Sequence, residues 1–566
     1  MGTLFSALDI ARSGLQAAQT QLDVSGHNIA NVNREGYTRQ RVVLNDRYPI
    51  EQTYGYIGRG VQVQTVERLR ETFLDTVYRQ QVPTLGAAQT RAAYYARLQD
   101  LFQEPGDSGF GTQIDDFFNA LNDFANNVEE QPVRMSVVTE AQTLAQNLNE
   151  ISRQIYSLRT NANEEVIHAI PEINSYAEQI AALNVNIRIA EGSGGTANDL
   201  RDERDLLLDK LSSLINVTIS ERQTGEVDVL VHGSQLVNAT QFREIIAVPD
   251  GTLDPDRADL VALRFADNNE AVVVTDGQIF GALQARDVDT VDMQNRMDNL
   301  AAALIEQMNQ VQSTGRGLVN LSGNITGSNA VTNAGTPLGT AGLPFDVTVP
   351  GSFDVTVYDA GGTPTTTTIN INAGTTLNSL AASLNGVANF SASVNANGTL
   401  TLGATGANTF SFGNDSSNVL TALGINSFFT GDSASNISVS DQILNDPRLL
   451  SSSFNTDVLN TGDNSAALAL AQVRTATVLE NNTASINDYY ESTIVRLGVS
   501  ARANTQTMDV VQSFVNDFQQ RRQEVSGVSL DEEAVNLMQF QRAYEASAHV
   551  VSVANAMMDA LMGMIQ

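Results

Sequence analysis

The two ends of the chain carry the same periodic pattern of apolar side chains, and this pattern limits the fold more than any other feature. Near the N-terminus, apolar or small residues recur at alternating spacings of four and three, which predicts a helix with a heptad-like seam. The members of this seam are Leu4, Leu8, Ala11, Leu15, Ala18 and Leu22. The C-terminal segment has a similar seam, formed by Leu537, Phe540, Tyr544, Val551, Ala554, Met558, Leu561 and Ile565. Because chain ends are usually polar and frayed, we expect both helices to bury these seams, against each other and against other copies of the chain.

The C-terminal helix carries two further signals. Ser529 and Glu532 form an S-x-x-E capping box, which predicts that the helix begins there. Val550 and Met557 widen the apolar stripe beyond the seam of a two-stranded coiled coil. We therefore expect this helix to contact more than one neighbour.

The stretch "SGHNIANVNREGYTRQ", residues 25–40, lies between the first helix and residues that alternate between apolar and polar, as in a β-hairpin. Its asparagines suit the side-chain-to-backbone hydrogen bonds that end helices, and Gly36 can adopt a turn conformation that other residues resist. The stretch lacks the Gly-rich loop at the start of a helix that binds phosphate. We interpret it as a joint that ends the helix and starts the hairpin, in which His27 packs and has no catalytic role.

The order of patterns along the chain predicts a multidomain α+β protein of elongated shape. Its terminal helices would pair as a coiled-coil-like domain, beside a helical-bundle core that carries two inserted β-rich domains. The predicted segments are 1–85 (N-terminal axial helix plus hairpin, pairing with 500–566), 86–216 (first part of the helical core), 217–285 (β-rich insertion), 286–316 (helical core continued), 317–445 (charge-poor β domain rich in Thr, Asn and Gly), 446–499 (return of the helical core) and 500–566 (C-terminal axial helix). Breaks in the helical pattern are expected around Pro132 and Pro171.

The charge-poor segment marks the sharpest change in composition. Residues 318–440 contain aspartate but no lysine, arginine or glutamate. Two copies of "FDVTV", at 345–349 and 353–357, are separated by Pro-Gly-Ser and predict a hairpin, and the pair Asn397-Gly398 predicts a second one. These signals favour a β sandwich or barrel over a disordered tract.

Composition excludes several classes of function. With 64 acidic and 32 basic residues, the chain has a net charge of −32, so nucleic acid and anionic membranes are not expected partners. The absence of cysteine excludes disulfides and thiolate metal sites. The four histidines are scattered, and neither H-E-x-x-H nor G-x-S-x-G occurs. We therefore expect no enzyme, and no catalytic, cofactor-binding or metal-binding residues.

The motifs at both ends resemble one known family. The segment "ALDIARSGLQAAQTQLDVSGHNIANVNREGYTRQ" is similar to the N-terminal motif of the bacterial flagellar axial proteins, which comprise rod, hook and hook-associated proteins. The matching positions are Asn28, Ile29, Ala30, Asn31, Asn33, Gly36, Tyr37, Arg39 and Gln40. The segment "GVSLDEEAVNLMQFQRAYEASAHVVSVANAMMDALM" resembles the hook-associated members that join hook to filament. One departure is Arg34-Glu35, where the family often has Thr-Pro or Thr-Asp.

The resemblance implies a structural role outside the cell. Such proteins leave the cytoplasm through the flagellar type III export channel without a cleavable signal peptide, and no signal peptide is visible in this sequence. They assemble through their terminal helices into a ring of about one helical turn at the hook–filament junction, and they end hook growth. The implied partners are the hook protein below, a second junction protein and flagellin above, the cap protein, and a cytoplasmic export chaperone that binds the C-terminal helix. Two alternatives stay open: a hook or distal-rod protein, and a surface adhesin carried by 317–445.

Overall fold

The computed structural model describes residues 2–52, 55–104, 106, 109–192, 194–456 and 461–563. The chain combines helices and sheets in more than one domain, with long helices at both ends, as predicted. It divides into two compact units, which are described separately below. Unit 1 comprises Met1–Ala93, Asn161–Ala285 and Ala503–Gln566, and unit 2 comprises Tyr94–Thr160 and Arg286–Arg502. The predicted seven-segment division is finer and stays a prediction. None of the described helices is both long enough and apolar enough to span a membrane.

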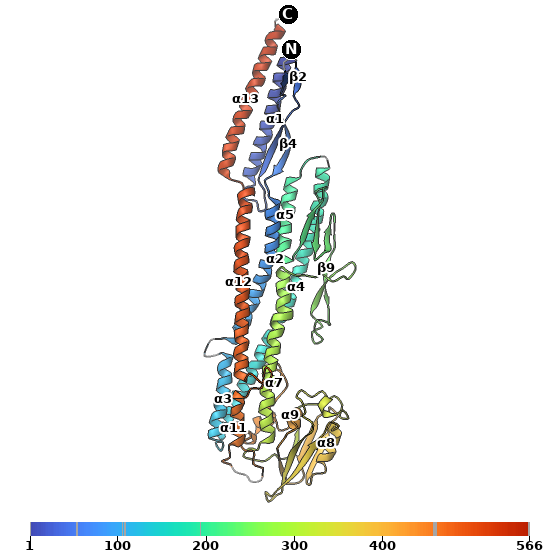
Figure 1. Ribbon diagram of the computed structural model, residues 1–566, viewed down its shortest axis with the longest axis vertical. Helices are drawn as coiled ribbons and strands as arrows, with labels where there is room; N and C mark the ends of the chain where they lie inside the picture. Colours follow the sequence, from blue (N-terminus) through green and yellow to red (C-terminus); the bar gives the residue numbers. More distant parts are fainter. Residues whose placement is uncertain are drawn as a thin grey trace. The chain divides into compact units, whose positions relative to one another are not determined.

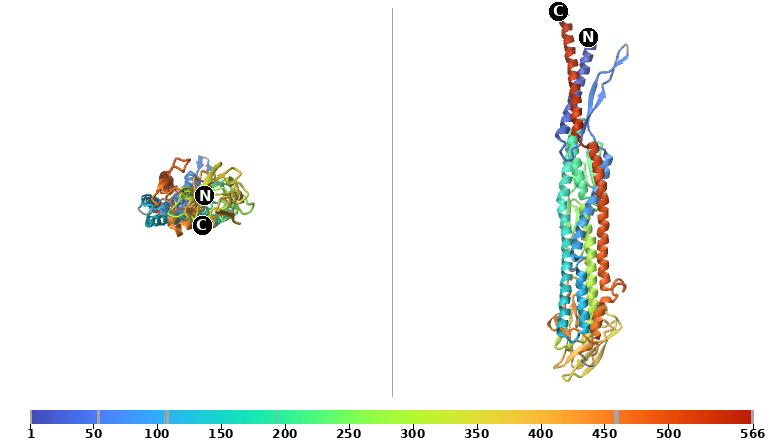
Figure 2. Two further views of the ribbon diagram at one scale, coloured as in Figure 1. Left: turned by 90° about the horizontal axis from the view of Figure 1, so that it is seen from below. Right: turned by 90° about the vertical axis from the view of Figure 1, so that its left-hand side faces the viewer.

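In unit 1 the two terminal helices pack side by side. Helix α1 (Gly2–Ala30) lies along α13 (Leu530–Gly563), and the two ends of the chain lie at the same end of this pair (Figures 1 and 2). Gly14 allows a close approach, because a Cβ atom at this position would lie 3.0 Å from the Ser547 hydroxyl oxygen. Helix α13 begins directly after Ser529, whose Oγ accepts a hydrogen bond from the Glu532 N–H at 3.5 Å. The predicted start of this helix is therefore confirmed.

The predicted hairpin follows α1. Strand β1 (Gln40–Asp46) pairs antiparallel with β4 (Val61–Arg68), and the tip adds the short pair β2 (Ile50–Gln52) and β3 (Gly55–Ile57). The hairpin lies close to α1 at Gly60, between β3 and β4, where a Cβ atom would lie 2.2 Å from Ser13 Oγ. Gly60 also has a φ of +87°, which glycine adopts without strain.

The rest of unit 1 packs helices against a four-stranded and a two-stranded antiparallel sheet. Its core joins the second half of a long helix, the helix that follows it and both sheets, with Val166, Ile180, Leu208, Val229 and Phe265 almost fully buried. The elements are α2 (Thr72–Phe102), α4 (Gln131–Glu191), α5 (Asn198–Leu214), β5 (Thr218–Glu221), β6 (Val227–Val231), β7 (Ser234–Asn238), β8 (Gln241–Phe242), β9 (Ile245–Pro249), β10 (Val261–Phe265), α6 (Gln278–Gln284) and α12 (Ile486–Ser526). Helices α2, α4 and α12 also contribute residues to unit 2.

The expected break at Pro171 is wrong, whereas the break at Pro132 is confirmed. Helix α4 begins at Gln131, so Pro132 lies in its first turn, where a missing N–H costs nothing. Pro171 lies inside the same helix, which continues for a further 20 residues to Glu191. Its side chain is exposed, whereas Val166, Ile170 and Ile173 on the other face are buried in the core. Burial of that face holds the helix together through the proline.

Unit 2 combines a helical core with the charge-poor β domain. The helical core buries large side chains such as Phe117, Phe118, Leu144 and Met297. Its helices are α3 (Phe110–Asn126), the first part of α4, α7 (Thr290–Thr314), α11 (Ser465–Gln472) and the first part of α12. The β domain contains β11 (Asn324–Thr326), β12 (Gly351–Tyr358), β13 (Pro364–Ile371), α8 (Leu377–Leu384), β14 (Phe390–Val394), β15 (Leu400–Ala404) and β16 (Thr409–Gly413). Its sheets have the strand orders β13-β12-β16 and β11-β15-β14.

One of the two predicted hairpins in this domain is wrong. The second "FDVTV" copy lies in β12, but the first copy, 345–349, forms no strand. Both edges of β12 are already paired, with β13 and with β16, so no edge is left for the first copy. The Thr348 N–H instead donates to the Ser417 carbonyl at 2.8 Å. The other hairpin is confirmed, since Asn397 and Gly398 connect β14 to β15.

Candidate assembly surface and its joint

The motif loop folds back on the end of α1 through the side chain of Asn28. Helix α1 continues through Gly26 to Ala30, so the joint begins later than the first residue of the quoted stretch. Asn28 is 1% exposed. Its Nδ2 donates to the Gln40 carbonyl at 3.0 Å, and its Oδ1 accepts from the Gln40 N–H at 2.9 Å and from the Tyr37 hydroxyl at 2.7 Å. Asn28 therefore fixes where β1 starts relative to the helix.

Two further motif residues, Gly36 and Gln40, contact helix α5, as do their neighbours Thr38 and His27. Gly36 has a φ of +78°, and a Cβ atom there would lie 3.1 Å from Leu206. The Thr38 N–H donates to Asp202 at 2.9 Å, and Gln40 Nε2 donates to Asp199 at 2.8 Å. His27 Nε2 lies 3.2 Å from the same Asp199 carboxylate. Asn33 is exposed, and so is the pair Arg34-Glu35, which differs from the family motif.

Arg39 connects the loop to the first turn of α13. Its Nε donates to Glu533 Oε1 at 2.8 Å, and its Nη1 donates to Glu532 Oε2 at 2.7 Å. The Glu533 side chain is 2% exposed, and its other oxygen accepts from the Ser25 hydroxyl at 2.7 Å. The Arg39 N–H also donates to the Ser526 carbonyl, in the last turn of α12, at 2.9 Å. The loop therefore contacts the ends of α1, α12 and α13.

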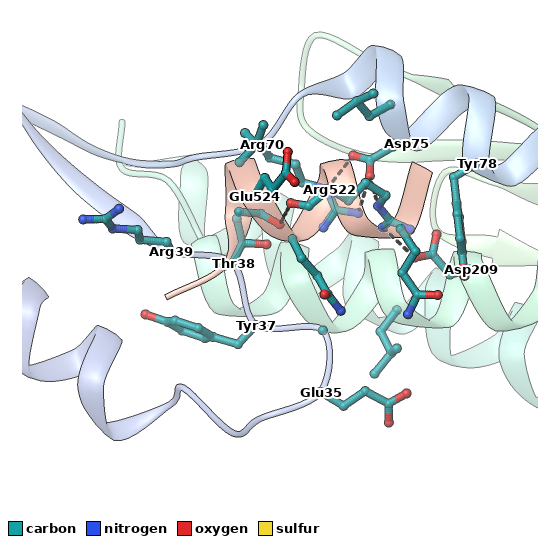
Figure 3. Close-up of a pocket in the computed structure, with 18 of the residues that line it drawn as sticks. Glu35, Tyr37, Thr38, Arg39, Arg70, Asp75, Tyr78, Asp209, Arg522 and Glu524 are labelled. Carbon is teal, nitrogen blue, oxygen red and sulfur yellow. Dashed lines mark hydrogen bonds and ion pairs between the residues drawn. The ribbon is translucent and has the colours of Figure 1, made fainter. Parts of the chain in front are cut away.

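Below the loop, carboxylates on α5 and α2 meet arginines from three segments. Arg68 donates to Asp202 and Asp205 at 2.8 Å each, and Arg522 donates to Asp209 at 2.7 Å. The other contacts of this cluster, partly drawn in Figure 3, join Arg70 to Asp75 and Asp205, Arg79 to Asp205 and Asp209, and Arg522 to Asp75.

Burial and charge act against each other on the carboxylates of this cluster. Burial raises the pKa of Asp205, but the cations of Arg70 and Arg79 outweigh it, so that its pKa lies well below the ordinary value. Burial dominates at Asp202, whose pKa is raised although Arg68 donates to it. Burial and the carboxylates around the loop also raise the pKa of Tyr37. Asp205 therefore stays charged and Tyr37 stays a neutral phenol at neutral pH, which suits a rigid joint.

A cavity of about 900 Å³ opens between the loop, α2, α5 and the end of α12. Charged side chains of both signs line it, and Figure 3 shows them projecting from these elements. They include Arg39, Asp209, Arg522 and Glu524. Most are already joined in the ion pairs above. No group of three or more histidine and carboxylate side chains among the described residues is placed to hold a metal ion.

The predicted seam residues belong to α1 and α13, which pack side by side, and most of those described are buried or half-buried. Ala11, Ala18 and Ala554 are buried. The larger members are half-buried, namely Leu8, Leu15, Leu22, Leu537, Phe540, Val551 and Met558, whereas Tyr544 is exposed. The side chains of Leu4 and Leu561, and the whole of Ile565, lie outside the described residues.

A second apolar face of α13 points away from this seam. Val535, Met538, Val550, Val553 and Met557 are all exposed, with fractions of 57%, 56%, 47%, 39% and 52%. At 100° per residue they fall within one third of the helix circumference, and their mean direction differs from that of the seam residues by more than a quarter turn. Sequence reasoning identified two of the five, Val550 and Met557. It missed Val535, Met538 and Val553, although the same spacings of three and four would have found them.

The comparisons with known proteins point in one direction. Three family models match: "Flagella basal body rod protein" over residues 8–38, "Flagellar hook-associated protein FlgK helical domain" over 95–329, and "Flagellar basal body rod FlgEFG protein C-terminal" over 519–564. Flagellar hook-associated protein 1 of Bacillus subtilis is 28% identical, covering 99% of this chain and 98% of that protein. The same protein of Escherichia coli is 26% identical, covering 98% and 99%.

A solved structure supports the fold. The flagellar hook junction protein FlgK from Burkholderia pseudomallei superposes with a TM-score of 0.50 at 18% identity, over 79% of this chain and all of that one. The family models match in the order expected from the terminal motifs, and the relatives align over nearly their whole length. The chain is therefore similar over nearly its whole length to flagellar hook-associated protein 1, in agreement with the resemblance of its terminal motifs.

Proposed function

We propose that this protein is a structural component of the junction between flagellar hook and filament, where it ends hook growth and works without catalysis. The observation that carries the proposal is the second face of α13 (Val535, Met538, Val550, Val553 and Met557). This face stays exposed although α13 packs along α1. Contiguous exposed apolar side chains mark protein contact sites. Burying one such side chain fully stabilises an interface by about 1.5–3 kcal/mol, so a row of them drives association of copies.

The finer parts of the proposal follow from the similarity to flagellar hook-associated protein 1 and from this surface. Copies assemble through α1 and α13, whose pairing is coiled-coil-like, into a ring of about one helical turn. The hook protein lies below, and a second junction protein, flagellin and the cap protein lie above. The chain reaches this place outside the cell through the flagellar export channel, and before export a cytoplasmic chaperone binds α13. The seam residues and the second face would both contribute to subunit contacts.

The test separates association from folding. We expect Val550→Asp and Met557→Asp to abolish self-association of the purified chain, measured by light scattering and sedimentation, and to abolish motility in a deletion strain. Both side chains are exposed, so the melting temperature should stay within the small range typical of surface substitutions. Ser552→Asp is the matched control, because Ser552 is exposed on a third side of the same helix.

If both aspartate variants assemble like the parent chain, the second face is not a subunit contact. Labelling with gold-conjugated antibody under the electron microscope tests the location. A band between hook and filament supports the junction, whereas staining along the hook supports the alternative of a hook or distal-rod protein.

A further inference from the structure

The β domain of unit 2 protects the edges of its sheets unequally. The outer edge of β14 is capped by Asn385, whose side chain donates to the Ala392 carbonyl at 2.7 Å and accepts from the Ala392 N–H at 2.9 Å. The outer edge of β16 is bridged by Leu321, which exchanges two backbone hydrogen bonds of 2.9 Å with Phe410. Strand β13 is the third long edge. Within the described residues, its outer side has no backbone partner.

The register shows which groups β13 presents. Alternate residues of a strand direct their N–H and C=O groups to opposite sides. Pro364 is opposite Tyr358 of β12, and because it has no N–H it cannot belong to a hydrogen-bonded pair. The hydrogen-bonded positions of β13 are therefore the alternate residues that follow it, Thr365, Thr367 and Ile369. The backbone groups of Thr366, Thr368 and Asn370 therefore point outward, and the side chains of these three residues are exposed as well.

The chemistry of this edge is unusual for an unpaired strand. Edge strands normally carry lysine, other charged residues or proline, or are very short, because a bare edge accepts another strand. Strand β13 has eight residues and contains no charged side chain, and its proline is its first residue. Its threonines also belong to the residue types that pair well across strands. Within this domain Thr356 already contacts Thr366 at 2.9 Å, and Thr326 contacts Thr401 at 2.8 Å.

We propose that β13 is a docking edge for the same strand of a second copy of this chain, with the two strands antiparallel. A second copy supplies a complementary edge without any charge, whereas most of the surface of a chain with net charge −32 repels another copy. Threonine would face threonine across the new pair, as it does inside the domain. An extended segment of a different protein is the competing occupant.

The symmetry of this contact separates it from the proposed ring. Two identical strands that pair antiparallel are related by a two-fold axis, so the contact is closed and joins copies in pairs. It cannot repeat around a ring of parallel copies. It therefore acts outside the ring and does not depend on the second face of α13. A single pair of strands buries less surface than a stable interface requires, so the association is weak and needs a high protein concentration.

The chain contains no cysteine, which allows a direct test. Thr366→Cys, Thr367→Cys and Thr368→Cys are made singly in the full-length chain and oxidised at high protein concentration. Thr366→Cys and Thr368→Cys are also mixed, because in one register residue 366 of one copy lies opposite residue 368 of the other. We expect a disulfide-linked dimer for at least one of these samples, with a yield at least several-fold above that of Thr340→Cys, an exposed residue outside the strands of this domain.

A second variant separates specific pairing from random collision. Proline at position 366 removes an N–H that points outward, so β13 keeps its bonds to β12. We expect Thr366→Pro to reduce the dimer yield of Thr368→Cys to the control level, with unchanged circular dichroism and melting temperature. Yields equal to the control at every position overturn the proposal. So does a dimer that persists in the Thr366→Pro background. A dimer that forms only when a second protein is added assigns the edge to the competing occupant.

Discussion

Replacing Arg39 by alanine tests whether the joint holds α13 in place. Arg39 is the only side chain that donates to both Glu532 and Glu533 among the described residues. The Glu532 contact is worth at most about 1 kcal/mol, because the Glu532 side chain is 63% exposed. Glu533 is different, because its side chain is 2% exposed and would stay buried with Ser25 as its one remaining side-chain donor. Removing one partner of a buried pair costs about 3–5 kcal/mol, and the remaining Ser25 bond favours the lower end.

The assay is hydrogen exchange of the backbone amides in the first turns of α13. A loss of about 3 kcal/mol increases the population of the locally open state by about two orders of magnitude, since each 1.4 kcal/mol is a factor of ten. We therefore expect Arg39→Ala to accelerate exchange in residues 533–540 by about this factor. Arg41→Ala is the control, because Arg41 pairs with Glu67 and both side chains are largely exposed.

A double-mutant cycle decides whether the buried charge is responsible. Glu533→Gln keeps the shape of the side chain and removes the charge, so Arg39→Ala should cost less in this background. The difference between the two costs is the coupling energy. If Arg39→Ala costs the same with glutamate or glutamine at position 533, or if exchange in α13 does not accelerate, the joint does not hold this helix through the ion pair.

Four further substitutions test other features. Gly60→Ala should destabilise unit 1 by about 2 kcal/mol or more in urea unfolding, because the new Cβ atom collides with α1 and the φ is positive. Gly26→Ala, on an open part of α1, should instead stabilise by up to about 1 kcal/mol. Burial raises the pKa of Glu306, so its ionised form opposes folding and stability falls as the pH rises through the raised value. Glu306→Gln should therefore raise the melting temperature at pH 7, and the gain should vanish below the ordinary pKa of 4.5. Pro171→Ala should stabilise α4 by up to about 3 kcal/mol in the same unfolding assay.

The features that local patterns determine could be predicted from the sequence. The spacing of leucines and alanines indicated both terminal helices, the capping box located the start of α13, and alternation indicated the hairpin after residue 40. Gly36 was correctly assigned to a turn after the helix, whereas Asn28 lies inside α1, which continues to Ala30. Each of these features depends on residues within a few positions of each other.

The contacts of the joint could not be predicted, because their partners are far apart in the chain. Arg39 and Glu533 are separated by 494 positions, and nothing near either residue indicates the other. The carboxylates on α5 carried a partial signal. Asp202, Asp205 and Asp209 are three and four residues apart, so they share one face of the helix. Three acidic groups on one face, next to a buried apolar face, indicate arginine partners, but the sequence does not say which arginines.

The polar character of the joint follows from what α13 has to do. A single helix is marginal in water, and its second apolar face would be hidden if the helix turned about its own axis on α1. The half-buried leucines of the seam permit several arrangements of similar energy, because apolar contacts have no direction. Hydrogen bonds and ion pairs do have direction, and Glu533 gains further from its place at the positive end of the helix dipole. Any rotation of α13 would leave the buried Glu533 carboxylate without its donors. The free energy lost in this way exceeds the free energy lost when the apolar contacts shift. The seam thus supplies adhesion between the helices, whereas Arg39 and Ser25 determine which face of α13 is offered to the next copy.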